Sequence, residues 1–172
     1  YQQYYSRALR KFNELATIKE SEYELENRLW IAKCYLQLRE FNKALRLLDQ
    51  IKIDAAENEE EEVLKEVYKS KIGYLIYNED YDEAVSAINE FLNTDIDDEL
   101  RAEVLYETGL LYKLIEDFES AEKAFASVEE YSPTFEIDFS SQFEVAKLRR
   151  ELGKVEESLT LFSDLKDQDK FS

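Results

Sequence analysis

Small residues recur along the chain at a nearly constant interval, and each lies in a run of apolar residues with helical spacing. Large apolar residues stand three positions before, four positions after and seven positions after each small residue, which places all of them on one helix face. The small residues are Ala8, Ala44, Ala84, Ala121 and Ser158, at intervals of 36, 40, 37 and 37 residues. The residues four positions later are Phe12, Leu48, Ile88, Phe125 and Phe162. The pattern predicts five related amphipathic helices produced by internal repetition.

The copy from Leu105 to Pro133 shows how each such helix pairs with a preceding one. Gly109 and Ala121 have almost no side chain, so the two helices that carry them can approach closely. Tyr112 and Phe125 fill the remaining space, and Pro133 cannot continue the second helix. The stretch therefore predicts an antiparallel helix hairpin. One hairpin cannot bury its apolar faces alone, so neighbouring copies are required.

The spacing of these five residues resembles that of the tetratricopeptide repeat (TPR), as do the turn strings REFNKA, EDYDEA and EDFESA. The resemblance covers four full repeats and one half repeat. It also has departures, because the family's mid-helix glycine appears only as Gly109, and bulky Ile72 occupies that column in the third copy, next to Gly73. The family's tryptophan column holds Arg28, Tyr68, Leu105 and Gln142.

The resemblance implies an all-α, right-handed α-solenoid of antiparallel helix hairpins, with about nine helices in a single domain over residues 1–172. Only three glycines and one proline are present, which agrees with a helical chain that has few loops. The expected half repeat covers 2–16, and the full repeats cover approximately 22–52, 58–93, 98–131 and 138–166. We expect the acidic run at 57–62 to be a long, solvated helix start, which would account for the 40-residue interval.

Composition narrows the function. The net charge of −18 repels phosphate backbones and anionic lipid, so nucleic acid and membrane surfaces are poor partners. The sequence has no histidine, and Cys34, its single cysteine, lies in an apolar helical stretch typical of a buried residue. No catalytic motif and no apolar run long enough to span a membrane is present in the sequence. We therefore expect a non-enzymatic chain with no cofactor, no metal site and no membrane insertion.

In the TPR family the first helices of the hairpins line a concave surface. The twenty corresponding positions hold five basic and four acidic residues, whereas the rest of the chain holds 17 and 36. One interpretation is that an inward face avoids crowding of like charges. The other is a groove for an extended or helical peptide with negative charge and apolar anchors. In the second interpretation the partner-binding residues are Lys33, Lys69, Tyr77, Tyr106, Lys113, Phe143, Lys147 and Arg150.

The leading hypothesis is a protein–protein interaction scaffold that binds a protein or peptide in the groove. The absence of asparagine from these groove positions argues against the carboxylate clamp by which some family members hold chaperone tails. One alternative is a structural subunit of a bacterial envelope or secretion assembly, which packs through its convex face or its ends. Another is the regulatory arm of an enzyme. The composition suggests a bacterial protein, in the cytoplasm or, preferably, the periplasm or envelope.

The sequence also begins partway through a repeat and contains no methionine, so we interpret it as a fragment of a longer protein. The helix expected at 2–16 would then lack its hairpin partner. We expect that helix either to fray or to self-associate through this end.

Overall fold

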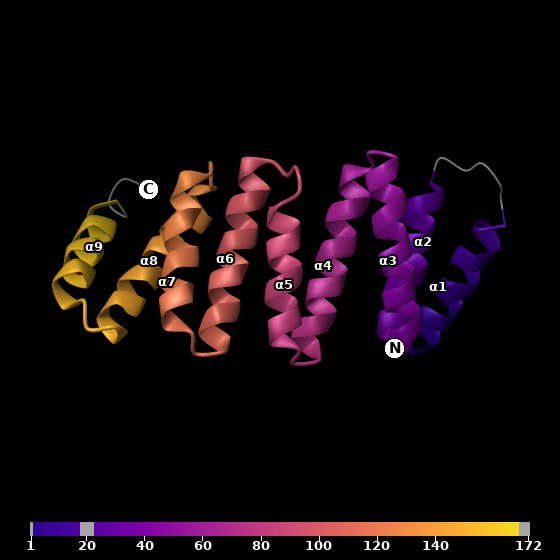
Figure 1. The fold of residues 1–172 in the computed structure, drawn as a ribbon, viewed down its shortest axis with the longest axis horizontal. Helices are drawn as coiled ribbons and strands as arrows, with labels where there is room; N and C mark the ends of the chain where they lie inside the picture. The colour runs from indigo at the N-terminus through magenta and orange to yellow at the C-terminus, as the bar shows by residue number, and fades with distance from the viewer. Residues whose placement is uncertain (1, 18–22, 169–172) are drawn as a thin grey trace. The chain divides into compact units, whose positions relative to one another are not determined.

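The computed structural model describes residues 2–17 and 23–168, and these form nine α-helices, one 3-10 turn and no strand (Figure 1). The predicted all-α class and the number of helices are therefore confirmed for this part of the chain. No helix among these residues is both long enough and apolar enough to cross a membrane. The helices are α1 (Gln2–Leu15), α2 (Glu24–Gln37), α3 (Phe41–Glu57), α4 (Glu61–Tyr77), α5 (Tyr81–Leu92), α6 (Asp98–Leu114), α7 (Phe118–Ala126), α8 (Phe135–Glu151) and α9 (Val155–Gln168), with the 3-10 turn η1 (Ser127–Glu130) after α7.

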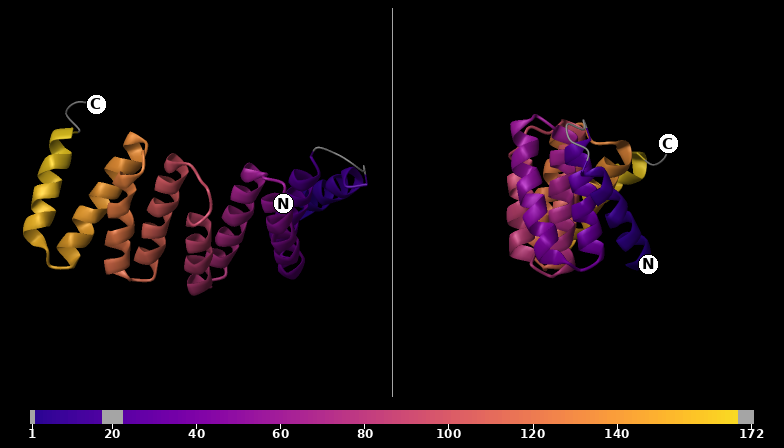
Figure 2. Two further views of the ribbon diagram at one scale, coloured as in Figure 1. Left: turned by 45° about the horizontal axis from the view of Figure 1, so that its top comes forward. Right: turned by 90° about the vertical axis from the view of Figure 1, so that its right-hand side faces the viewer.

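The chain divides into two compact units, Tyr1–Ala87 and Ile88–Ser172, and α5 crosses the boundary between them. In the first unit α2 packs against α1, α3 and α4, and Figures 1 and 2 show α2, α3 and α4 side by side. Apolar residues from α2, α3 and α4 form its core. They are Leu29, Ala32, Leu48, Ile51, Ala55, Val63 and Val67. Full burial of a leucine or isoleucine side chain stabilises a fold by about 1.5–3 kcal/mol, so this cluster holds the three helices together.

In the second unit α6 packs against α7, and α8 packs against both α7 and α9. The core joins Ala121 and Phe125 of α7 to Val145 and Leu148 of α8. Gly109 of α6 lies directly under the Phe125 ring, since a Cβ atom added to Gly109 would stand 2.7 Å from three carbons of that ring. The predicted close packing of Gly109 is therefore confirmed, and its cause is the ring of Phe125.

The ladder of small residues is buried in four of the five helices that carry it. Ala44, Ala84 and Ala121 are fully buried, and Ser158 is 2% exposed. Ser158 fits the column because its hydroxyl donates a 2.7 Å hydrogen bond to the carbonyl of Ala146. This bond satisfies a polar group that would otherwise cost free energy on burial. In the first helix, by contrast, Ala8 is only half-buried.

Each tight turn between helices uses one residue in the left-handed region. Arg39, Glu79, Glu116 and Gly153 have φ values of 61°, 64°, 61° and 80°, each two positions before the next helix. The backbone N–H of the following residue bonds back to the carbonyl five residues earlier, as from Glu40 to Tyr35 at 2.9 Å. These bonds satisfy carbonyls that the end of a helix leaves free. A repeated local motif therefore produces the reversals of the chain.

The expectation that the acidic run at 57–62 is a long helix start is wrong for all but Glu61 and Glu62, which lie in the first turn of α4. Helix α3 continues to Glu57, Glu59 takes a φ of 58°, and α4 begins only at Glu61. The middle of the run, 58–60, is thus a turn with the same geometry as the others, including a 2.9 Å bond from the N–H of Glu60 to the carbonyl of Ala55. The long interval in the ladder comes from α3, which has 17 residues, whereas α5 has 12.

Gly109 and Gly73 both lie inside helices, and we expect opposite effects when they are changed to alanine. Gly109→Ala should lower the free energy of unfolding by about 1–3 kcal/mol, because the new methyl group overlaps the buried Phe125 ring. Gly73→Ala should raise it by up to about 1 kcal/mol, because its Cβ would meet no atom within 4 Å. Thermal unfolding followed by circular dichroism measures both. Equal effects at the two positions would contradict this account of the packing.

The turns give a second prediction. A left-handed conformation costs a non-glycine residue about 1–2 kcal/mol, so Glu116→Gly should stabilise the second unit by up to about 1 kcal/mol once the extra chain entropy of glycine is subtracted. Glu116→Gln is the matched control, since it removes the charge and keeps the strain. The reciprocal change, Gly153→Ala, should destabilise. If Glu116→Gln stabilised as much as Glu116→Gly in thermal melts, charge and not backbone strain would be the cause.

Candidate functional site

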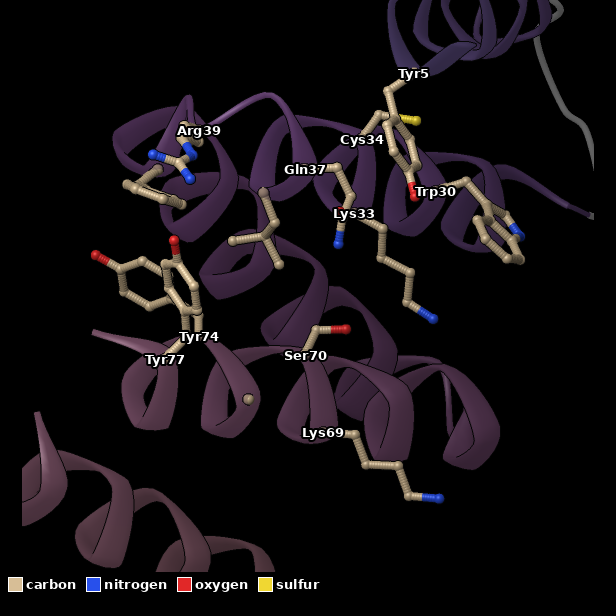
Figure 3. Close-up of a pocket in the computed structure, with 13 residues that line it drawn as sticks. Tyr5, Trp30, Lys33, Cys34, Gln37, Arg39, Lys69, Ser70, Tyr74 and Tyr77 are labelled. Carbon is tan, nitrogen blue, oxygen red and sulfur yellow. The ribbon is translucent and has the colours of Figure 1, made fainter. Parts of the chain in front are cut away.

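A pocket of about 730 Å³ lies in the first unit, between α2, α4 and the start of α1 (Figure 3). Helices α2 and α4 are first helices of their hairpins, which the family resemblance places on the concave surface. The pocket brings together three of the predicted binding residues, Lys33, Lys69 and Tyr77. The lining residues are Tyr5, Trp30, Lys33, Cys34, Leu36, Gln37, Arg39, Phe41, Lys69, Ser70, Gly73, Tyr74 and Tyr77.

The lining of this pocket differs from the rest of the chain in charge. Three of its side chains are cationic, those of Lys33, Arg39 and Lys69, and none is a carboxylate. The chain as a whole carries 40 acidic and 22 basic residues. Five of the thirteen lining residues are aromatic. A concave, aromatic and cationic surface is suited to a ligand with both apolar and anionic groups.

The three cations differ in how far they are already neutralised. Lys33 binds the Glu66 carboxylate at 2.6 Å, and its ammonium group stands 4.9 Å from the centre of the Trp30 ring. Arg39 and Lys69 are exposed and form no ion pair within the described part of the chain. These two cations are therefore available to an anionic ligand.

Packing and turn geometry hold one end of the pocket. Phe41 packs on Tyr74 with ring centres 4.9 Å apart, which fixes the start of α3 against α4. Arg39 lies two residues before Phe41, in the left-handed turn. In Figure 3 Arg39 lies on the same side of the pocket as Tyr74 and Tyr77, whereas Trp30 and Lys33 lie on the other. Sequence reasoning missed Arg39 because the turn is outside the groove columns of a first helix.

The predicted aromatic anchors of the second unit have internal partners. Tyr106 packs edge-on against Phe125 with ring centres 5.5 Å apart, and it borders the buried core of that unit. Phe143 is 42% exposed and packs edge-on against Phe162 of α9 at 5.6 Å. Of these two rings, Phe143 is therefore the one with surface to offer a partner.

The predicted cations of the second unit also have partners. Lys113 of α6 and Lys147 of α8 both bind the carboxylate of Glu144, the latter at 2.8 Å. Arg150 lies 3.3 Å from the carboxylate of Glu151, and both are exposed. Sequence reasoning missed Glu144 because it is not in a groove column. The only signal was its position three residues before Lys147, on the same helix face.

Two carboxylates of the second unit are held ionised by paired cations. Burial raises the pKa of Glu144, but hydrogen bonds and charge from Lys113 and Lys147 outweigh it, so the net pKa lies below the ordinary value. The same balance applies to Glu122 of α7. Burial raises its pKa, but Lys154 and Arg149 lower it by more, so the net pKa also lies below the ordinary value. These pairs join α6 to α8, and α7 to the end of α8 and the following turn.

Cys34 lies in the wall of the pocket but is only 3% exposed. Burial raises the pKa of its thiol, which keeps it protonated and unreactive at neutral pH. It is therefore a packing residue, as the sequence predicts. In the described residues no three histidine, cysteine, aspartate or glutamate side chains are grouped as metal ligands would be.

Helix α1 borders the pocket through Tyr5 and has no buried residue. It is held to α2 by Phe12, whose ring stacks on Trp30 at 6.0 Å, and by a 3.0 Å hydrogen bond from the amide of Asn27 to the Phe12 carbonyl. Tyr4 and Leu15 of α1 are 73% and 51% exposed. Fraying or self-association through this end stays a prediction.

A smaller cavity of about 130 Å³ lies among Phe125, Gln142, Val145, Arg149 and Leu161. Gln142 occupies the column that holds tryptophan in the TPR family, and Arg149 occupies the column of Tyr112. Two smaller or more polar residues thus stand where the family has large rings. Both residues line the cavity.

Comparison with known proteins places the fold. No family model matches the sequence, and no curated protein matches it. Solved structures do match. TPR-like repeats of a kinesin light chain candidate from Podosopora anserina align over 100% of this chain and 92% of theirs, at 18% identity and a TM-score of 0.67. The chain has a TPR-like fold.

Two structures of MamA support the same assignment. One aligns over 96% of this chain and 89% of its own, at 17% identity and a TM-score of 0.64. The other, MamA AMB-1, aligns over 99% of this chain and 92% of its own, at 16% identity and a TM-score of 0.61. At these identities the likeness shows the TPR-like solenoid fold alone. The bacterial origin stays a prediction.

The Glu144 cluster gives a pH-dependent prediction. Because its pKa is lowered on folding, Glu144 contributes stability above its ordinary pKa of 4.5, and this is lost as the pH falls through the folded value. Glu144→Gln should cost about 1–3 kcal/mol at pH 7, and its melting temperature should converge with the wild-type value below about pH 4.5. Glu107→Gln, an exposed α6 change without an ion pair among the described residues, is the control. A difference that stayed constant with pH would contradict the assignment.

Proposed function

We propose that this chain is a non-catalytic protein-interaction scaffold that binds an acidic peptide segment of a partner protein in the pocket between α2 and α4. The observation that carries the proposal is the charge of the lining, which has three cations and no carboxylate within a chain of net charge −18. Arg39 and Lys69, which have no carboxylate partner among the described residues, would bind the carboxylates of the peptide, while Lys33 is already paired with Glu66. Tyr77, Trp30 and Tyr74 would supply apolar contact.

Rings and cations have different roles in this proposal. An exposed ion pair contributes only about 0.2–1 kcal/mol, so the cations alone could not hold a peptide. Aromatic rings offer large contact area at low cost in side-chain entropy, and Tyr77 and Trp30 are 64% and 51% exposed. We assign affinity to the rings, and selectivity and association rate to the charges. The outer surface of the chain would repel the same acidic peptide except at this pocket.

A random octapeptide library, selected on the whole chain at low salt, tests the proposal. The wild type should enrich peptides that combine acidic residues with large apolar residues. The double variant Arg39→Glu/Lys69→Glu should lose the acidic enrichment and bind the best wild-type peptide about tenfold more weakly by fluorescence anisotropy, a loss of about 1.4 kcal/mol. Arg39→Glu matches the turn, because Glu79 and Glu116 already occupy the same position in other turns.

Lys123→Glu is the control for the change in charge. Lys123 is exposed on α7 in the second unit, so this variant should keep the wild-type selection. Thermal melts establish that all variants fold. Enriched peptides without negative charge, or equal affinity for the double variant and the wild type, would contradict the proposal.

A further inference from the structure

Gly73 is the one glycine of the three for which the fold gives no reason. Gly109 is needed under the Phe125 ring, and Gly153 has a φ of 80°. Gly73 lies inside α4 with no left-handed φ, and a Cβ there would meet nothing within 4 Å. A glycine inside a helix costs about 0.5–1 kcal/mol relative to alanine. The chain therefore bears a stability cost at a position that lines the pocket.

The missing side chain leaves a notch in the pocket wall. Lys69, Gly73 and Tyr77 stand at positions i, i+4 and i+8 of α4, so they share one face of the helix. All three line the pocket. The exposed backbone at Gly73 is thus bordered by a cation one turn before it and by an aromatic ring one turn after it. Leu36 of α2 lines the same pocket and adds apolar surface.

We infer that the bound peptide lies extended along α4, with a large apolar side chain in the Gly73 notch and a carboxylate at Lys69. This inference rests on the proposed function and deepens it. On one helix face, the Cβ atoms of residues one turn apart are separated by about 5–6 Å. In an extended peptide, residues two apart point to the same side and are separated by roughly 6.6 Å. The match selects an apolar residue and an acidic residue with one residue between them.

Filling the notch tests the inference without removing the cations. Gly73→Leu should abolish the enrichment of large apolar residues from the octapeptide library while the acidic enrichment persists. Its affinity for the best wild-type peptide should fall at least tenfold, and its melting temperature should not fall below that of the wild type. Gly73→Ala should give an intermediate loss. Gln50→Leu, at an exposed position of α3 outside the pocket, is the control for an added leucine and should bind like the wild type.

Peptide spacing gives a second readout that does not depend on mutation. End-blocked variants of the best peptide would separate its apolar and acidic residues by zero, one or two residues. The variant with one residue between them should bind most tightly. Unchanged binding by Gly73→Leu, or no preference in spacing, would overturn the inference. If either result were found while Arg39→Glu/Lys69→Glu still lost binding, the proposed function would stand and only the inference about the Gly73 notch would fail. A wild-type selection with no acidic and apolar enrichment would overturn both.

Discussion

The close approach of paired helices at residues without bulky side chains is the constraint on which the rest of the structure depends. Ala44, Ala84 and Ala121 are fully buried, and Gly109 leaves the space that the Phe125 ring occupies. Leu48, Ile88 and Phe125, four positions after these alanines, are buried as well. The turns then need only a few residues, and one residue in each takes the left-handed conformation. The buried packing of the helices and the short turns between them thus both follow from the close approach of the paired helices.

The helices were predictable because their signal is local and repeated. Small and large residues at fixed offsets identify a helix face whatever its partner is, and each copy supports the others. The acidic run at 57–62 was not predictable in this way. Glutamate suits both a helix start and a solvated turn, and the deciding fact is that Ala55 is still buried inside α3. Gln142, which departs from the tryptophan of the repeat pattern, lines a cavity that the sequence analysis did not predict.

The site was less predictable than the fold because it depends on which charges meet across helices. Lys33, Lys113 and Lys147 look alike in sequence, yet Lys33 binds Glu66 and both others bind Glu144. The Lys33–Glu66 and Lys113–Glu144 pairs link residues 33 and 31 positions apart, and no periodicity specifies them, whereas Lys147 and Glu144 lie three residues apart on one helix. Arg39 shows the opposite case. Its column holds glutamate in three other turns, so its charge stands out only once the turn is seen to border the pocket.

These pairings separate stability from recognition. A cation that neutralises a carboxylate between helices, as Lys113 does with Glu144, lowers the free energy of the fold and has little left to offer a ligand. A cation with no such partner keeps its full charge for solvent or for an incoming anion. Arg39 and Lys69 are of the second kind, and they line the same pocket as Gly73, a position where alanine would make a more stable helix. Two independent departures from the most stable arrangement therefore coincide in one pocket, and the proposed peptide ligand would explain both.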